Sequence, residues 1–403
     1  MKRIVVGAGF AGLWSAVGAA RKLDGLGIGP SDAGVTLVSR DAYHGIRVRF
    51  YEKDLSGVRV PLDQVLGPIG VERVEGNVTG IDVAARQVRA ETASGERTLP
   101  YDRLVFATGS RLHRPGISGL KEHAFAVDTY AEAETLGRHL KGLSARPASP
   151  ERFTAVVVGA GLTGIEAASE MPERLRAAGG RDGQVRVILL DCLPHVGSDM
   201  GEHARPVIEA ALSSLGVETR VGVTVKSIDP QGVTLGSGEK IPALTTLWTA
   251  GMRASALTEL FPVERDRLGR LPVDEFLRVR GVEDVFAAGD VARAMADAAH
   301  ASVMSCQHAR PQGRIAGHNV VADLFGEEMI AYRQPEYVTC LDLGPWGALY
   351  TRGWDRQLHN KGAGAKETKR TINCVRIYPP LSGNRREILD AAAPIIQAVP
   401  ATR

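Results

Sequence analysis

A glycine pattern directly after an apolar run constrains this chain more than any other feature. Residues 2–13 read KRIVVGAGFAGL, so the apolar residues 4–6 lead straight into Gly7, Gly9 and Gly12. Apolar residues with helical spacing follow at once, which gives the order strand, glycine turn, helix. In such a unit one glycine makes the tight turn, the next lets the backbone approach a pyrophosphate, and the third lets the helix pack on the strand. The pattern alone also suits an ordinary glycine-rich turn, so its context has to decide.

The same pattern occurs a second time. Residues 153–170 read FTAVVVGAGLTGIEAASE, with Gly159, Gly161 and Gly164 after the apolar run 155–158. A repeated strand, glycine turn and helix is poorly explained by coincidence. The sequence therefore predicts two dinucleotide-binding units in one chain, each with a phosphate at the positive end of its helix.

Each unit continues with a second apolar strand that ends on a polar residue. Ser39 ends this strand in the first unit and Asp191 in the second, both 32 residues after the first glycine. That spacing exceeds the usual ~20 residues. Glycine-rich loops at residues 25–29 and 179–183 account for the extra length in both units.

The duplication extends beyond the glycine turns. Residues 71–110 alternate and turn as antiparallel strands do, and residues 217–242 form a second meander of this kind. A buried strand closes each unit. We expect an α/β fold of two Rossmann-like domains with a small α+β C-terminal region. The expected division is a discontinuous first domain of residues 1–118 and 251–325, a second domain of residues 119–250, and a C-terminal region of residues 326–403.

Composition excludes several classes of protein. The chain has 403 residues, 44% apolar and 24% charged, and a net charge of +3, which is too small to indicate nucleic-acid binding. No window approaches the 18 apolar residues of a membrane span. The cysteines are scattered, so we expect no disulfide framework, no metal site and a reducing, cytoplasmic location. They are Cys192, Cys306, Cys340 and Cys374.

Two further stretches each have two interpretations. The loop 40–55 is rich in cationic and aromatic residues, among them Arg40 and Arg47, and suits either a solvated loop or a cationic lip over a cofactor. Residues 282–292, VEDVFAAGDVA, predict a strand that ends at Gly289 and Asp290 before a helix. That carboxylate can accept from a ribityl hydroxyl or cap the helix, and the two roles are compatible.

Taken together, these motifs resemble the two-dinucleotide-domain flavoproteins, and among them the type II NADH dehydrogenases, which are NADH:quinone oxidoreductases. Besides the two glycine turns, the resemblance rests on FATGS at 106–110, Ile165 and Glu166, TAG at 249–251, and AAGD at 287–290. It covers residues 1 to about 320. It implies FAD in the first unit and NADH in the second. The residues implied to bind these cofactors are Gly7, Gly9, Phe10, Ala11, Gly12, Ser39, Arg40, Arg47, Thr108, Gly109, Gly159, Gly161, Leu162, Thr163, Gly164, Asp191, Gly251, Gly289, Asp290 and Gln307.

The resemblance also implies roles for individual side chains. Asp191 would bond a ribose 2′-hydroxyl and repel a 2′-phosphate, which favours NADH over NADPH, although Arg186 and Arg181 lie near it in sequence and would soften the repulsion. Glu166 would handle a proton or orient nicotinamide and quinone; the alternative is a carboxylate on the helix surface. Residues 305–313 resemble the alanine–glutamine motif beside the flavin.

In that motif Gln307 and Gln312 would donate to a quinone carbonyl or to the flavin edge. The chain departs from the family here. Cys306 replaces the usual alanine, and Pro311 replaces the first of two glutamines, which leaves only Gln312. Ser39 also stands where an acid is common. These departures leave the identity of the acceptor open.

The tail departs further from membrane-bound members of the family, which end in apolar or amphipathic helices. Here Pro394 interrupts the one candidate helix, residues 387–399, and Pro400 follows. The basic stretch 351–370 carries six Lys or Arg against two acids. We favour a solvated face for it over a peripheral contact with the inner membrane face, and leave a homodimer open.

The function expected from the resemblance is hydride transfer from NADH to FAD and two-electron reduction of a quinone-type small molecule. The main alternative is the reduction of a partner redox protein such as a ferredoxin or rubredoxin, with the basic tail recognising an acidic partner. A sulfide oxidase and a flavoprotein that senses NADH are further alternatives. No cysteine precedes Cys192, which excludes the disulfide-reductase branch with its cysteine pair beside the flavin.

Overall fold

The computed structural model describes residues 2–7, 9–181 and 183–398. Five parallel strands form the first sheet, in the order β20-β9-β1-β2-β5. The strands of the first sheet are β1 (Lys2–Gly7), β2 (Ala33–Ser39), β5 (Glu72–Glu75), β9 (Arg103–Phe106) and β20 (Val285–Ala287). Because β20 pairs with β9, the chain returns to this sheet after leaving it for about 180 residues of sequence.

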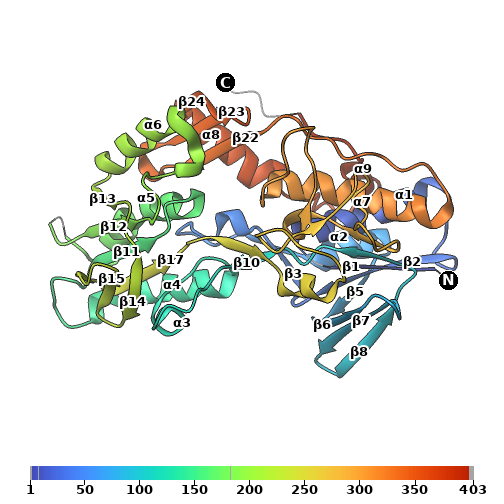
Figure 1. The fold of residues 1–403 in the computed structure, drawn as a ribbon, viewed down its shortest axis with the longest axis horizontal. Helices are drawn as coiled ribbons and strands as arrows, with labels where there is room; N and C mark the ends of the chain where they lie inside the picture. The colour runs from blue at the N-terminus through green and yellow to red at the C-terminus, as the bar shows by residue number, and fades with distance from the viewer. Residues whose placement is uncertain (1, 8, 182, 399–403) are drawn as a thin grey trace.

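Four parallel strands form the second sheet, in the order β13-β12-β11-β17. Its strands are β11 (Thr154–Val158), β12 (Arg186–Leu190), β13 (Val217–Arg220) and β17 (Thr245–Trp248). Every residue of β11 and β17 is buried, as expected of parallel strands covered on both faces. Figure 1 shows the two sheets side by side, with their helices around them.

Helices cover both sheets in the pattern of a Rossmann-like fold. α1 (Phe10–Gly25) and α7 (Cys306–Phe325) pack along each other over the first sheet, and α5 (Leu162–Ala177) follows the first strand of the second sheet. The remaining helices are α2 (Leu62–Leu66), α3 (Leu120–His123), α4 (Tyr130–Gly142), α6 (Gly201–Ser214), α8 (Ala363–Thr371) and α9 (Arg385–Ala391). The expected α/β fold is confirmed.

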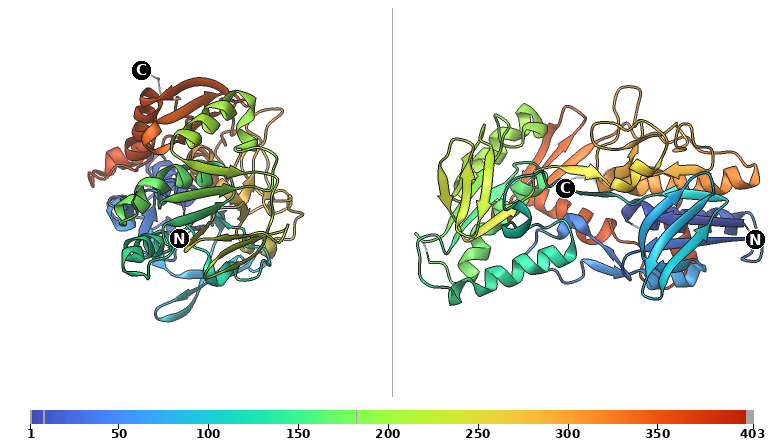
Figure 2. Two further views of the ribbon diagram at one scale, coloured as in Figure 1. Left: turned by 90° about the vertical axis from the view of Figure 1, so that its left-hand side faces the viewer. Right: turned by 60° about the horizontal axis from the view of Figure 1, so that its bottom comes forward.

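Each sheet carries a small antiparallel sheet, as the duplication predicts. These are β6 (Asn77–Asp82), β7 (Gln87–Thr92) and β8 (Gly95–Pro100) on one side, and β14 (Val225–Asp229), β15 (Gly232–Leu235) and β16 (Lys240–Pro242) on the other. Both meanders start one strand later than expected, because β5 and β13 are parallel edge strands of the main sheets. The first small sheet projects from the molecule in Figure 2.

Two antiparallel strands join the halves of the molecule. They are β10 (Ser110–Leu112) and β18 (Met252–Ala254). The C-terminal part adds the antiparallel strands β22 (Val338–Asp342), β23 (Ala348–Arg352) and β24 (Gln357–Gly362), followed by α8 and a π-helical turn, η8 (Ile372–Arg376). These elements lie beside α5 and α6 in Figure 1. The shorter paired strands are β3 (Tyr43–Gly45) with β4 (Arg59–Pro61), and β19 (Leu271–Pro272) with β21 (Ala292–Arg293).

The last helix is short. α9 ends at Ala391, three residues before Pro394, in line with the expected break. Residues 399–403, with Pro400, lie outside the described residues. Within the described ranges, no helix is long and apolar enough to cross a membrane.

Candidate functional site

The N-terminal ends of α1 and α5 face one large cavity. Its volume is about 1430 Å³, and its wall includes Phe10 and Ala11 from α1 and Leu162 and Thr163 from α5. A pocket for one drug-sized ligand measures roughly 300–1,000 Å³. This cavity therefore has room for more than one cofactor.

The first glycine loop has the geometry of a phosphate cradle. Gly9 lines the cavity and adopts φ +132°, a backbone conformation that residues with a side chain rarely adopt. A Cβ on Gly12 would stand 1.7 Å from the carbonyl oxygen of Gly7, so only glycine lets α1 pack this closely on β1. The backbone N–H groups at the start of α1 lack helical partners and attract an anion. The site thus fits a dinucleotide pyrophosphate.

The second glycine loop repeats this geometry. Gly159 adopts φ +105°, and a Cβ on Gly164 would stand 1.7 Å from the carbonyl oxygen of Gly159. Asp191 lies beside this loop, where its Oδ2 accepts from the backbone N–H of Ala160 at 2.5 Å. Its carboxylate therefore braces the loop. Arg186, one of the two cations expected to soften its charge, is instead paired with Glu218 at 2.6 Å.

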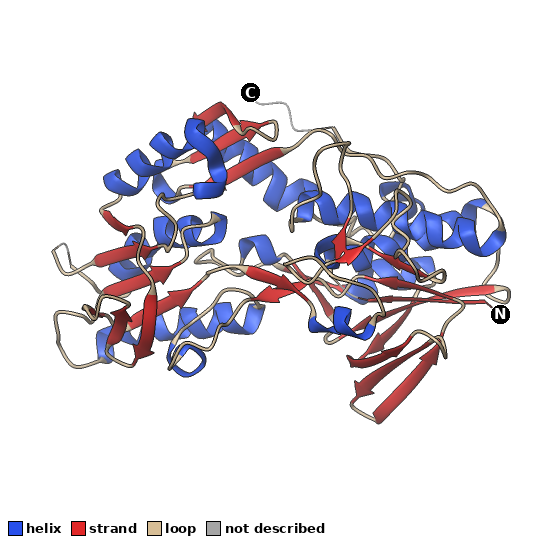
Figure 3. Ribbon diagram, viewed as in Figure 1, coloured by secondary structure: helices blue, strands red, loops and turns tan. Residues whose placement is uncertain are grey.

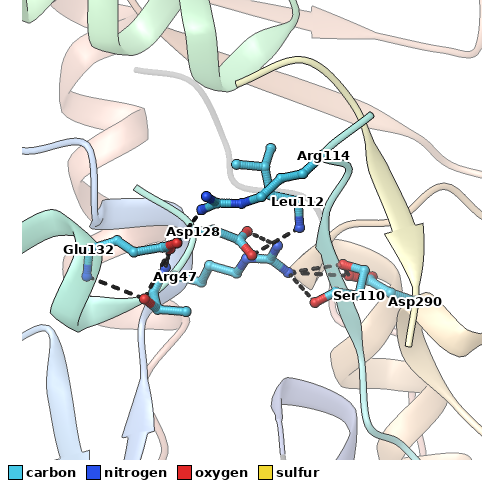
Figure 4. A network of polar contacts seen from close by, with 8 residues as sticks. Arg47, Ser110, Leu112, Arg114, Asp128, Glu132 and Asp290 are labelled. Atoms are coloured by element: carbon cyan, nitrogen blue, oxygen red, sulfur yellow. Dashed lines mark hydrogen bonds and ion pairs between the residues drawn. The ribbon is translucent and has the colours of Figure 1, made fainter. Parts of the chain in front are cut away.

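Asp290 lies on the wall of the cavity in a network centred on Arg47, shown in Figure 4. The Ser110 hydroxyl donates to Asp290 Oδ2 at 2.6 Å, and the Arg47 guanidinium lies 3.8 Å from the same carboxylate. Arg47 also donates to Ser110 Oγ at 2.9 Å and pairs with Asp128. Burial raises the pKa of Asp290, while Ser110 and Arg47 oppose that shift.

The expected helix directly after Asp290 is absent, so the helix-cap interpretation is wrong. Residues Gly289–Val291 form a single 3-10 turn that leads into β21, and the next α-helix begins only at Cys306. The Asp290 side chain instead contacts Ser110 and Arg47 on the wall of the cavity.

Glu166 forms a buried ion pair on the cavity wall. It is 7% exposed, and Lys369 Nζ lies 2.6 Å from its Oε1. The backbone N–H of Asp342 donates to the same oxygen at 3.2 Å, and Lys366 pairs with Asp342 at 2.5 Å. The interpretation as a surface carboxylate is therefore wrong, because C-terminal residues cover this face of α5.

Burial and ion pairing shift the pKa of Glu166, and that of Lys369, in opposite directions. Burial raises the pKa of Glu166, and the Lys369 ammonium partly opposes that rise. Burial by itself would lower the pKa of Lys369, but the Glu166 carboxylate outweighs it and the pKa is raised. Such a pair can hold a proton near the cavity.

The two predicted glutamines occupy different positions. Gln307 lines the cavity, but its amide is engaged with β22: Nε2 donates to Val338 O at 3.0 Å, and Oε1 accepts from Val338 N at 3.1 Å. Gln312 is fully buried and does not line the cavity; its Oε1 accepts from Gly289 N at 2.7 Å. Gln312 therefore braces the turn that carries Asp290.

The cavity brings together most of the residues predicted from the sequence. Those on its wall are Gly9, Phe10, Ala11, Ser39, Arg40, Arg47, Thr108, Gly109, Leu162, Thr163, Glu166, Gly289, Asp290 and Gln307. The other predicted residues do not line the cavity. Those are Gly7, Gly12, Gly159, Gly161, Gly164, Asp191, Gly251 and Gln312.

Several wall residues were not predicted from the sequence. Lys369 was assigned to a basic stretch with a solvated face, yet it is 8% exposed, and nothing in the local pattern connects it with Glu166, 203 residues earlier. Trp354, from the same stretch, does not line the cavity but stacks on the wall residue Tyr337, with ring centroids 4.6 Å apart. The basic stretch is thus partly turned inward. No group of three or more potential metal ligands occurs among the described residues.

Comparison with known proteins gives a consistent result. The family model described as pyridine nucleotide-disulphide oxidoreductase matches residues 1–313. An NADH dehydrogenase-like protein of Mycobacterium tuberculosis is 55% identical over 399 residues, which are 98% of this chain and 99% of that protein.

The chain is also similar to a more distant relative by sequence and to a solved structure. The type II NADH:quinone oxidoreductase Ndh of Mycobacterium tuberculosis is 32% identical over 316 residues, or 72% of this chain and 66% of that protein. The structure of NDH2 from Plasmodium falciparum in complex with NADH superposes with a TM-score of 0.78, covers 97% of both chains and is 13% identical. At that identity the superposition shows the fold alone.

Proposed function

The chain belongs to the pyridine nucleotide-disulphide oxidoreductase family, and from that premise we propose that it oxidises NADH through bound FAD and passes two electrons to a quinone-type acceptor. It is an NADH-dependent flavoprotein oxidoreductase. The observation that carries the proposal is the shared cavity: the starts of α1 and α5 both face it, and the Glu166–Lys369 pair lies on its wall.

FAD and NADH are the cofactors. The cradle at Gly9 and the start of α1 would hold the FAD pyrophosphate, and Ser39 and Asp290 would accept from ribose and ribityl hydroxyls. When bound, FAD supplies the hydride-accepting ring. The proposal includes the division into an FAD unit of residues 1–118 and 251–325 and an NADH unit of residues 119–250.

The NADH site would be built on α5. Gly159 and Gly161 would let the dinucleotide approach the start of the helix, and Leu162 and Thr163 would contact it from the cavity wall. Asp191 adds negative charge beside the loop, which disfavours a 2′-phosphate. Its bond to Ala160 N means that the carboxylate contributes to the shape of the loop as well as to selectivity.

The Glu166–Lys369 pair would supply protons on the acceptor side. Nζ of Lys369 and Oε1 of Glu166 are 2.6 Å apart, a distance over which a proton can be shared. The backbone N–H of Asp342 also donates to Oε1 of Glu166. The Asp342 carboxylate is itself paired with Lys366, at 2.5 Å. Gln307 and Gln312 would act mainly by positioning, since their Oε1 atoms accept from backbone N–H groups.

A quinone-type acceptor is supported by the 32% identity to a type II NADH:quinone oxidoreductase. The test is an anaerobic rapid-mixing experiment on the FAD-loaded protein. NADH should bleach the flavin absorbance, and a short-chain quinone should restore it over many turnovers. Activity that needs an added ferredoxin or rubredoxin would favour the partner-reductase alternative. A single bleaching with no turnover by any acceptor would contradict the proposal.

A further inference from the structure

Four residues that donate hydrogen bonds line the cavity from two elements. Arg310 and Arg314 lie one turn apart on α7, and Asn373 and Arg376 lie on η8. All four residues line the same cavity, and the guanidinium groups of Arg310 and Arg314 lie over one ring, that of Trp14. We call these four residues the donor wall.

Three of these donors have no acceptor among the described residues. The Nε atoms of Arg310 and Arg314 and Nδ2 of Asn373 are buried and form no hydrogen bond. Arg314 is 2% exposed and Asn373 is 5% exposed. Arg376 donates to the backbone carbonyl of Ala398 at 2.7 Å. An unpaired buried donor is unfavourable, so the donor wall indicates a ligand that accepts hydrogen bonds.

The aromatic ring of Trp14 supports both helical arginines. The guanidinium carbon of Arg310 lies 5.2 Å from the ring centroid and that of Arg314 lies 4.3 Å from it. This stacking fixes the guanidinium planes, which leaves their edges for bidentate recognition of carboxylate-like groups. Trp14 is one helical turn beyond Phe10, where α1 and its phosphate cradle begin. The two arginines therefore stack on a residue one helical turn from the phosphate cradle.

Among the described residues, no carboxylate forms an ion pair with an arginine of the donor wall. Burial lowers the pKa of Arg310 to about 10 and that of Arg314 to about 9, so both stay charged at neutral pH. The buried acids of the cavity already have cationic or hydroxyl partners. Glu166 pairs with Lys369, and Asp290 pairs with Ser110 and Arg47. The unlike charge that these arginines need has to come from a ligand.

We propose that the donor wall binds an anionic group of the electron acceptor, so that the acceptor is a quinone-type ring bearing a carboxylate or sulfonate-like acid. This inference rests on the proposed function and narrows its substrate class. A guanidinium fork pairs best with a planar or tetrahedral oxyanion, and the pair is strengthened by exclusion of water. A neutral lipid quinone offers only carbonyl oxygens and would leave these charges uncompensated.

Binding of a redox-inert probe tests the site without turnover. We would titrate the FAD-loaded protein with naphthalene-2-sulfonate and with the neutral naphthalene-2-sulfonamide by calorimetry. Arg310→Met and Arg314→Met should each weaken sulfonate binding about tenfold or more, the loss expected for a charge-assisted hydrogen bond. Binding of the sulfonamide should change far less. Arg370→Leu, which removes an exposed cation from α8, is the matched control and should alter neither.

The melting temperature and the FAD content of each variant show whether a loss of binding comes from misfolding or from loss of the cofactor. Because the arginines are unpaired, Arg314→Met should melt at the same or a higher temperature than the parent without ligand. The variants should also retain their FAD. Loss of FAD with unchanged sulfonate affinity would assign the donor wall to the cofactor phosphates and overturn the proposal, as would equal weakening of both probes.

Kinetics separate this proposal from the proposed function. With 1,4-naphthoquinone-2-sulfonate as acceptor, the two variants should raise KM, while KM for 1,4-naphthoquinone stays near the parent value. Unchanged KM for the sulfonated quinone would overturn the acceptor assignment even if the probe binds. Failure of NADH to bleach the flavin would instead overturn the proposed function, and the probe titration would still decide whether the wall holds an anion.

Discussion

At the scale of single residues, the Glu166–Lys369 pair has the clearest consequence. Both side chains are almost fully buried, at 7% and 8% exposure, so each depends on the other for compensation of its charge. Removing one partner of a buried ion pair costs far more than removing both, because the remaining charge stays in a low-dielectric environment.

We predict that Lys369→Met lowers the free energy of unfolding by about 3–5 kcal/mol at neutral pH, because it leaves a buried, unpaired carboxylate. Burial already raises the folded-state pKa of Glu166 above its unfolded value. The contribution of Glu166 to the free energy of unfolding is therefore largest below the ordinary glutamate pKa, and it is lost as the pH rises through the raised pKa. Loss of Lys369 raises the pKa further, so the fall with pH becomes larger.

Urea denaturation at several pH values measures both effects. The double variant Glu166→Gln with Lys369→Met is the matched control, since it removes the titrating group along with its partner. It should recover much of the lost stability and abolish the added pH dependence. A single variant with the parent's pH dependence would show that the pair is not coupled in the folded protein.

The sequence predicted only those residues of the site that belong to a local pattern. Glu166 and Asp290 were located because each follows a glycine turn or a strand end with a recognisable local pattern. Lys369 and Arg314 belong to no such pattern. Their positions depend on how α8 and α7 pack against elements far away in sequence, which charge and periodicity do not encode.

At the scale of secondary-structure elements, glycines let α1 and α7 run in contact. A Cβ on Gly317 would lie 2.2 Å from the carbonyl oxygen of Ser15, and one on Gly313 would lie 2.4 Å from that of Ala11. The close approach places Gly313 beside the start of α1, and Cys306 and Gln307, at the start of α7, lie on the wall of the same cavity. Glycine in mid-helix is thus required here despite its poor helix propensity.

We predict that Gly317→Ala destabilises the protein by about 1–3 kcal/mol, the usual cost of overpacking. Gly137→Ala on α4 is the matched control, since no atom lies within 4 Å of its Cβ position. It should stabilise the protein by about 0.5–1 kcal/mol through helix propensity. Chemical denaturation of both variants gives the comparison. Similar shifts in one direction would show that helix propensity, rather than contact between α1 and α7, decides the outcome.

The elements that the sequence predicted are those with local signals. α1 and α5 begin directly after their glycine turns, and β11 and β17 are the buried runs that periodicity identifies. The edge strands β5 and β13 were assigned to meanders because a short polar edge strand has the same alternation in a parallel as in an antiparallel pair. Whether such a strand pairs in parallel or antiparallel is decided by the strand beside it, β2 for β5 and β12 for β13.

At the scale of the whole molecule, Arg47 links segments from both halves. It contacts Ser110 on the connecting strand β10, Asp290 after β20, and Asp128 just before α4. Asp128 in turn accepts from Leu112 N at 3.0 Å. One guanidinium thus fixes a connecting strand and the segment that enters α4 relative to the proposed ribityl-binding carboxylate.

We predict that Arg47→Met weakens FAD binding by about tenfold, the effect of losing a charge-assisted contact, and increases amide exchange around residues 110–112. Without the guanidinium, Asp290 keeps its hydrogen bond from Ser110 but loses a nearby positive charge, so burial raises its pKa further. Arg49→Met is the matched control, because Arg49 lies in the same 3-10 turn but pairs with Glu52 and donates to the Tyr378 hydroxyl. FAD retained after dialysis and hydrogen exchange measure the two effects. If Arg49→Met releases as much FAD as Arg47→Met, the loop as a whole, and not the link between the halves, holds the cofactor in place.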